Sequence, residues 1–287
     1  MQQRLLAAAV LVPVVVIVFL LGQPWLTLGI ALLAALAAFE TARLVRAAGM
    51  PADVWLAVVA APLAVIGLPL LIGPGSLERG WTLMAAAVGL VVLLAGVVAL
   101  RHRQPISGFQ AWAGTLLSVL YPGLLAFLAG IVALGMAYPV PILPLDLDAG
   151  RAWLLVLVLT VWTLDSGAYV AGKFHGRGRF MNHISPNKTW SGAIGGTLAA
   201  VAVCTVLVWA LANNPLGGAL LGLLLAVAAQ AGDLVESMLK RAAGVKDSGA
   251  IIPGHGGVLD RVDSFLFAAP AMFIALAVAD IFSVVPA

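Results

Sequence analysis

The segment from Ser237 to Asp263 combines acidic, basic and glycine residues in a chain in which only 9% of residues are charged. Near its end, Asp260 and Asp263 are three residues apart, so they share one face of a helix that opens the last apolar run. Carboxylates at such a helix start suit Mg²⁺, which binds one or two carboxylates and completes its shell with water and phosphate. The alternative is an acidic N-cap, which accounts for only one of these carboxylates.

Another acidic group overlaps the start of this segment. Asp233, Glu236, Ser237 and Lys240 are spaced i, i+3, i+4 and i+7, and so lie on one face of a helix predicted over 231–246. The alternative is a solvated helix end held by salt bridges. Asp233 lies at the predicted membrane boundary, where an unpaired carboxylate costs roughly a few kcal/mol unless it is paired or binds a metal. We therefore favour a functional role for this face.

The turn from Pro253 to Gly257 has the sequence Pro-Gly-His-Gly-Gly. Its glycines permit positive φ and let main-chain N–H groups approach an anionic ligand closely. Glycine turns are common, so this pattern is informative only together with the aspartates that follow it.

A further polar set lies around the predicted helix over 152–172. Asp165 and Tyr169 are one helical turn apart, with Lys173 one turn beyond. Asp165 lies inside an apolar run, so we expect it to point into the bundle interior and to have a partner.

Two neighbouring loops could bind phosphate. Residues 172–179 are basic and glycine-rich, and Ser185-Pro186-Asn187-Lys188-Thr189 precedes the next apolar run. For Arg177 and Arg179, the alternative is contact with anionic lipid headgroups.

The composition is typical of an integral membrane protein. Hydrophobic side chains make up 63% of the 287 residues, and the mean hydropathy is +1.11, well above that of soluble domains. A hydrocarbon core about 30 Å thick needs roughly 20 helical residues. The candidate runs lie at about 5–21, 25–39, 54–72, 81–100, 112–137, 152–172, 190–212, 216–232 and 262–285.

We therefore expect an all-α polytopic membrane protein, a bundle of about nine transmembrane helices. No linker or internal repeat divides it, so we expect a single membrane domain over 1–287. Within it, 1–150 would form a scaffold for lipid and dimer contacts, and 151–287 would carry the catalytic helices and loops. The single cysteine, Cys204, excludes an intrachain disulfide, and the composition offers no basic face for nucleic acid.

The distribution of basic residues predicts the orientation. With a cytoplasmic N-terminus, nine crossings place 13 of the 15 Lys and Arg residues on the cytoplasmic side. This predicts an N-in, C-out topology with the active site at the cytoplasmic face. The first run could instead be a signal peptide, because Arg4 precedes it, but Gly22-Gln23-Pro24-Trp25 is a poor cleavage site.

The segment from Ser237 to Asp263 resembles, over 27 positions without a gap, the signature of CTP:phosphatidate cytidylyltransferases, also called CDP-diacylglycerol synthases. Asp-Ser-x-Ala-Tyr at 165–169 and Ser-Pro-x-Lys-Thr at 185–189 are also similar to motifs of that family. The strong resemblance covers roughly residues 160–265. Ser191 departs from it, since many members carry Glu or Gln at that position.

The resemblance implies that CTP and phosphatidic acid react to give CDP-diacylglycerol and pyrophosphate, with Mg²⁺ required and K⁺ assisting. It also implies a homodimer, multi-pass in a bacterial-type inner membrane. Asp233 and Asp260 would hold the metal, with Asp263 as a ligand or a support. The other residues assigned to catalysis are Lys240, Arg241, Lys246, Asp247, His255 and Arg261. Those assigned to substrate binding are Asp165, Tyr169, Ser185, Lys188, Thr189, Ser237, Gly256 and Gly257.

Two other functions have to be weighed. A secondary transporter would also have many spans and a buried Asp165, but its charges would gather at the midplane, and no repeated half is evident. A CDP-alcohol phosphotransferase would carry an Asp-Gly-x2-Ala-Arg motif and paired aspartates, which this sequence lacks. Release of pyrophosphate distinguishes a cytidylyltransferase from both.

Overall fold

The computed structural model describes residues 2–71, 77–135, 147–176, 178–254 and 256–278. Over these residues the chain is helical, with two isolated β-bridges and no β-strand. The helices are α1 (Gln2–Leu21), α2 (Trp25–Ala47), α3 (Val54–Leu71), α4 (Leu77–Ala99), α5 (Pro105–Gly123), α6 (Ala126–Gly135), α7 (Ala149–His175), α8 (Trp190–Ala212), α9 (Pro215–Ala242) and α10 (Leu259–Val278).

The predicted all-α membrane architecture is confirmed. Eight segments of the described residues are long and apolar enough to cross a membrane, and each corresponds to a predicted run. The first predicted run coincides with α1, which includes the apolar stretch Leu11–Leu21. Eight of the nine predicted crossings thus correspond to segments long and apolar enough to cross a membrane, and the count of nine stays a prediction. Residues 279–285 of the last predicted run and the predicted connector at 73–75 lie outside the described residues.

The fifth predicted run, 112–137, overlaps one segment that is long and apolar enough to cross a membrane, Pro105–Gly135, but this segment is not one continuous helix. The helix begins earlier, at Pro105, and ends at Gly123, and α6 begins at Ala126. Pro122 lacks an N–H group for the helical ladder. At the break, Leu125 N–H donates to Pro122 O at 3.1 Å, an i→i+3 turn instead of an α-helical bond.

The chain divides into two compact units. The first contains Met1–Gly130 and Met238–Val262, and the second contains Ile131–Ser237 and Asp263–Ala287. Both α9 and α10 contribute residues to each unit. The prediction that all 287 residues form a single domain stays a prediction.

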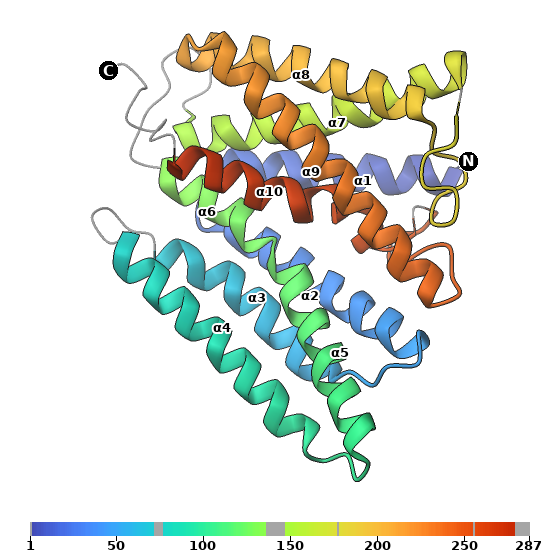
Figure 1. Cartoon of the computed structure of the whole chain (residues 1–287). Coiled ribbons are helices and arrows are strands. Elements are labelled where there is room, and N and C mark those ends of the chain that lie inside the picture. Colours follow the sequence, from blue (N-terminus) through green and yellow to red (C-terminus); the bar gives the residue numbers. More distant parts are fainter. Residues whose placement is uncertain (1, 72–76, 136–146, 177, 255, 279–287) are drawn as a thin grey trace. The chain divides into compact units, whose positions relative to one another are not determined.

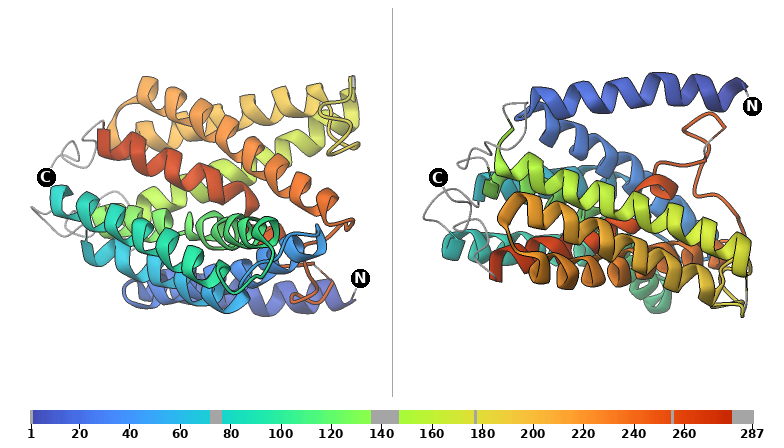
Figure 2. Two further views of the ribbon diagram at one scale, coloured as in Figure 1. Left: turned by 60° about the horizontal axis from the view of Figure 1, so that its bottom comes forward. Right: turned by 90° about the horizontal axis from the view of Figure 1, so that it is seen from above.

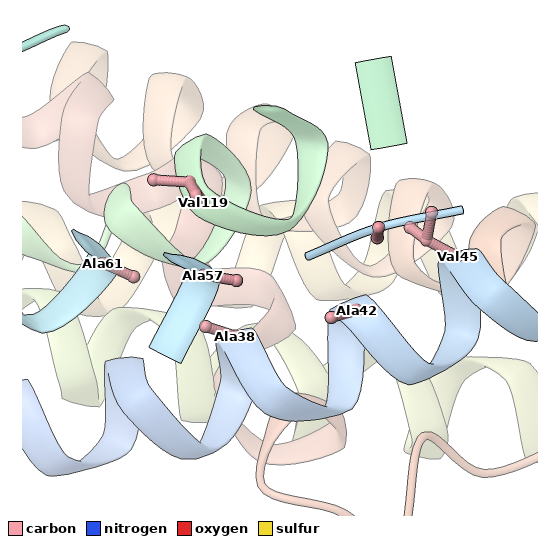
Figure 3. Packing of buried hydrophobic residues seen from close by; sticks show 7 residues of the cluster. Ala38, Ala42, Val45, Ala57, Ala61 and Val119 are labelled. Carbon is pink, nitrogen blue, oxygen red and sulfur yellow. The ribbon is translucent and has the colours of Figure 1, made fainter. Parts of the chain in front are cut away.

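Small side chains hold the first unit together. Ala38 and Ala42 of α2 and Ala57 of α3 are fully buried in one cluster with Val119 of α5 (Figure 3). Alanines let helix axes approach closely, so that backbone and side-chain atoms make dense contacts. This packing fixes the position of the second half of α2, which carries Glu40.

Glycines hold α7 against α8 in the second unit, where the two helices lie side by side (Figures 1 and 2). A Cβ atom added to Gly196 of α8 would lie 2.6 Å from the carbonyl oxygen of Leu164 on α7. One added to Gly167 of α7 would lie 2.8 Å from the Ala199 Cβ. These contacts bring the polar end of α7 next to the start of α8.

The predicted helical continuation of the eighth run past the apolar residues is confirmed up to Ala242, where α9 ends. It was wrong beyond that residue. Gly244 has φ +72°, and its N–H donates to Arg241 O while Val245 N–H donates to Lys240 O, both at 3.0 Å. This pair of bonds is a Schellman ending, which glycine favours because it has no Cβ.

Candidate active site

A cavity of about 440 Å³ opens in the second unit beside the polar end of α7. Asp165 and Tyr169 on α7, Lys188 in the loop before α8, and Asp233 on α9 all line it. The cavity therefore collects acidic and basic groups from three segments, although most of the second unit is apolar. Its other polar or charged lining residues are Lys173, Asn187, Thr189, Gln230 and Ser264.

Lys188 and Asp233 form an ion pair at the cavity. The Lys188 Nζ lies 2.5 Å from Asp233 Oδ2, and the two side chains remain 27% and 33% exposed. The Asp233 carboxylate also accepts a hydrogen bond from the Ser237 hydroxyl at 3.4 Å. Because a partly exposed pair is only weakly favourable in water, Lys188 can exchange Asp233 for a phosphate at small cost.

Asp165 lies near the same pair. Its carboxylate is repelled by Asp233 and attracted by Lys188. The Asp165 side chain is exposed to the cavity that these segments line, and the prediction that it points into the bundle interior stays a prediction. The prediction of a partner is met by Lys188, a residue of the following loop.

The loop before α8 is shaped so that Lys188 faces the cavity. Phe180 N–H donates to Lys188 O at 2.8 Å, and Trp190 N–H donates to Gly178 O at 3.0 Å. Lys188 N–H donates to Ser185 O at 3.2 Å, so Ser185 contributes a main-chain turn to this arrangement. The role predicted for Ser185 in substrate binding stays a prediction.

Thr189 ends the loop by capping α8. Its hydroxyl accepts from Gly192 N–H at 3.1 Å, which satisfies one of the free donors of the first turn. Ser191 Oγ lies 3.2 Å from the same hydroxyl. Thr189 therefore has a structural task in addition to lining the cavity.

Gln230 is a cavity residue that the sequence reasoning did not select. Its Nε2 donates to Thr197 Oγ1 at 2.9 Å and to Ala226 O at 3.2 Å, which holds the amide between α8 and α9. The available signal was a polar amide within the apolar run 216–232, since such residues in membrane segments mark functional sites.

A second polar cluster lies in the first unit and centres on Asp260. One oxygen, Oδ1, lies 2.6 Å from Lys240 Nζ. The other, Oδ2, accepts from the main-chain N–H groups of Ser248 at 2.9 Å and Gly257 at 2.8 Å, and from the Ser248 hydroxyl at 2.9 Å. The Asp260 side chain is only 8% exposed. It ties α9, the glycine-rich loop and α10 together.

Glycine is needed at positions 256 and 257 of this loop for different contacts. Gly256 has φ +84°, and a Cβ there would lie 2.8 Å from Asp260 Oδ2. A Cβ on Gly257 would lie 2.6 Å from Glu40 Oε1. Both glycines thus let carboxylates reach the loop backbone.

The remaining predicted residues are more dispersed. Arg241, Lys246, Asp247 and Arg261 have exposed side chains, and Arg241 Nη1 donates to Val245 O at 3.0 Å. Asp263 accepts from its neighbour Ser264 N–H at 2.7 Å in the second unit. His255 lies outside the described residues.

Glu40 of α2 is another residue that the sequence reasoning missed. Helical spacing would pair it with Arg43 at i+3, but both Glu40 oxygens bind the glycine-rich loop and the start of α10. Arg43 lies instead over the Phe39 ring, 5.6 Å from its centroid. No local sequence pattern could have revealed contacts that join residues 208 to 219 positions apart.

The structure thus brings the predicted residues together in two groups, one in each unit. The second unit combines Asp165, Lys188 and Asp233 at the cavity, and the first combines Lys240 with Asp260, to which Ser248, a residue that was not predicted, also binds. That both groups serve one site stays a prediction. Chemically, paired lysines and carboxylates can exchange their mutual contacts for phosphate oxygens and cations.

Comparison with known proteins shows similarity to several bacterial phosphatidate cytidylyltransferases. Over 293 aligned residues, covering 94% of this chain and 94% of the other, the chain is 34% identical to a phosphatidate cytidylyltransferase of Synechocystis sp.. It is 46% identical over 130 residues to one of Bacillus subtilis, covering 45% of this chain and 48% of that protein. For one of Brucella suis, the identity is 47% over 131 residues, with 45% and 48% covered. Residues 2–279 match the cytidylyltransferase family, and this chain therefore belongs to that family.

Proposed function

We propose that this protein transfers the cytidylyl group of CTP to phosphatidic acid, giving CDP-diacylglycerol and pyrophosphate for phospholipid synthesis. The observation that carries the proposal is the cavity in which Lys188 faces Asp165 and Asp233, in a chain that matches a cytidylyltransferase family over nearly its whole length. The full-length similarity to a phosphatidate cytidylyltransferase supports the choice of the lipid substrate. It also disfavours a transporter.

In the proposed reaction, a phosphate oxygen of phosphatidic acid attacks the α-phosphorus of CTP and forms the new P–O bond. The bond from the α-phosphorus to the bridging oxygen breaks, and pyrophosphate leaves with that electron pair. A phosphate monoester is already largely ionised near neutral pH, so no general base is needed. The enzyme therefore acts mainly by positioning two anionic substrates and neutralising their charge.

Lys188 is suited to hold one of the phosphates. It is partly exposed on the cavity, and its present partner Asp233 is a partly exposed carboxylate of the cavity wall that a phosphate could replace. Lys240 is 12% exposed and bound to Asp260, so we assign it first to holding the loop. The exposed Arg241, Lys246 and Arg261 supply further positive charge for the triphosphate and lipid phosphate.

We propose Mg²⁺ as the cofactor, as the family resemblance implies. When bound, the ion would neutralise phosphate charge and hold the triphosphate in position. The described residues contain no group of three or more His, Cys, Asp or Glu side chains that could hold a metal. The residues nevertheless fit Mg²⁺, because it commonly binds through one or two protein carboxylates together with substrate phosphates.

The aspartates differ in how readily they could bind this ion. Asp233 is 33% exposed and shares its cavity with Asp165. Asp260 is 8% exposed, and Lys240 occupies its Oδ1, so a metal would have to displace that lysine. We therefore propose Asp233 as the main protein ligand. Asp260 remains the second predicted ligand, with Asp263 as a ligand or support.

We further propose a single catalytic membrane domain in the N-in, C-out orientation, multi-pass in a bacterial-type inner membrane, and functioning as a homodimer. The distribution of Lys and Arg among the loops supports the proposed orientation. The bacterial origin of the relatives supports the proposed location in a bacterial-type inner membrane. The cytoplasmic face is where CTP is available, and phosphatidic acid could enter sideways from the inner leaflet. The dimer and an assisting K⁺ follow from the resemblance alone.

The test is the reaction itself. Purified protein in detergent or liposomes, given CTP, phosphatidic acid and Mg²⁺, should release pyrophosphate and form CDP-diacylglycerol in equal amounts. Omitting phosphatidic acid is the control, because pyrophosphate release without it would indicate CTP hydrolysis. A protein that remains folded but forms no CDP-diacylglycerol would overturn the proposal.

A further inference from the structure

Glu40 lies in the second half of α2, and only 1% of it is exposed. Its Oε1 accepts from Val258 N–H at 3.1 Å, and its Oε2 accepts from Leu259 N–H at 2.7 Å. Because α10 begins at Leu259, these are two of the main-chain donors that a helix leaves without an internal partner. A carboxylate of another helix thus caps α10, and its charge is favourable at the positive end of the helix dipole.

The same carboxylate is connected to Asp260 through one hydroxyl group. Ser248 Oγ lies 3.1 Å from Glu40 Oε2 and 2.9 Å from Asp260 Oδ2. A hydroxyl has one proton, so Ser248 donates to one carboxylate at a time. The position of Asp260 and of its partner Lys240 therefore depends on where Glu40 holds Ser248 and the first turn of α10.

Two glycines of the loop make room for Glu40. A Cβ added to Gly249 would meet only Glu40 among its nearest atoms, including the Cδ at 2.9 Å and the Cγ at 3.3 Å. One added to Gly257 would lie 2.5 Å from Glu40 Oε2. Gly249 does not have a positive φ, so its backbone could accept alanine. The space for the Glu40 carboxylate is then the reason for glycine at 249.

We propose that Glu40 is a positioning residue for cytidylyl transfer, which holds the glycine-rich loop and the start of α10 so that Asp260 and Lys240 are in place. Glu40 itself touches none of the reacting groups in this proposal. The kinetic part of the inference rests on the proposed function, whereas the contact itself can be tested without it.

The first experiment compares Glu40→Gln with a neighbouring control, Thr41→Val. Thr41 is also buried on α2, but its hydroxyl donates to Ala37 O of its own helix at 2.8 Å. Glutamine keeps the shape and loses the charge and one acceptor, so we expect kcat/KM for CTP to fall about tenfold or more. Glu40→Asp, which keeps the charge, should retain more activity than Glu40→Gln.

Hydrogen–deuterium exchange separates the contact from the activity. In Glu40→Gln the amides of 248–259 should exchange faster than in the wild type, and by a larger factor than the amides of α7 and α8, while Thr41→Val leaves them unchanged. Faster exchange without loss of activity would overturn the functional role of Glu40. Unchanged exchange would overturn the contact, and an enzyme inactive before any substitution would refute the proposed function instead.

The second experiment does not depend on the folding of a Glu40→Gln protein. Gly249→Ala should lower activity in the wild-type background, because the new methyl group displaces the Glu40 carboxylate. The shorter side chain of Glu40→Asp withdraws from that space. In the Glu40→Asp background, Gly249→Ala should therefore lower activity by a clearly smaller factor than in the wild-type background. Equal losses in the two backgrounds would overturn the proposal.

Discussion

Asp233 and Asp260 have the same side chain in different surroundings. Asp233 is partly exposed and has a lysine and a serine as partners. Asp260 is mostly buried, and it accepts bonds from a lysine, a hydroxyl and two main-chain N–H groups. Loss of charge at these two positions should therefore have different consequences for stability.

We expect Asp233→Asn to abolish pyrophosphate release while lowering the free energy of unfolding by less than about 1 kcal/mol, as for an exposed ion pair. Asp260→Asn should also abolish activity, but it should lower the free energy of unfolding by about 2 kcal/mol or more, because buried donors lose a charged acceptor. Activity assays and denaturant unfolding in detergent measure the two effects. Full activity of Asp233→Asn would refute its role as a metal ligand.

Lys188 can be tested as the phosphate-binding residue of the cavity. Lys188→Gln should lower kcat/KM about tenfold or more, since one charged contact to phosphate is lost. Arg103→Gln is the control, because Arg103 is an exposed basic residue in the loop before α5 and does not line the cavity. Equal activity of the two variants would show that Lys188 contributes general charge only.

At the scale of helices, the cavity depends on how closely α7 and α8 approach. Gly196 of α8 faces the backbone of Leu164, the residue before Asp165. A side chain at this interface would move α7 away from α8 and separate Asp165 from Lys188. The glycines therefore serve the geometry of the site as well as helix packing.

Gly196→Ala should lower the free energy of unfolding by roughly 1–3 kcal/mol, because the added methyl group overlaps backbone atoms. It should also lower activity. Gly89→Ala in α4 is the matched control, since a Cβ there meets no atom within 4 Å, and alanine favours the helix. Thermal unfolding of both variants is the measurement, and equal stability would contradict the close packing.

At the scale of the whole molecule, the basic residues predict which loops face the cytoplasm. Placing 13 of the 15 basic residues on one side requires an odd number of crossings, and we predict nine. It also requires the loop before α8 to lie on the cytoplasmic side, with the loop between α8 and α9 on the opposite side.

Cysteine labelling can test this topology, because the chain has one cysteine, Cys204, and it is buried. A membrane-impermeant maleimide should label Asn214→Cys in cells with a permeabilised outer layer, and His183→Cys only in inverted vesicles. Both positions are exposed. Labelling of both variants from the same side would refute the predicted alternation.

The sequence by itself determined the class of the fold, the approximate helices and the chemistry. Apolar runs long enough to cross a bilayer can satisfy their backbone groups only as helices, and the polar residues between them follow an ordered motif over 27 positions. Local features also explain where the observed helix ends differ from the predicted ones. The break after Gly123 and the early end of α9 depend on single prolines and glycines whose effect hydropathy does not register.

Only the tertiary structure decided which residues meet. It placed Asp165 at a cavity with Lys188 and Asp233, added Gln230, and showed that Glu40 caps α10. Such contacts arise from helix packing between segments far apart in the chain, and no periodicity records them. Within the segment from Ser237 to Asp263, Lys240 and Ser248 hold Asp260, and Glu40 of α2, about 200 residues earlier, holds Ser248.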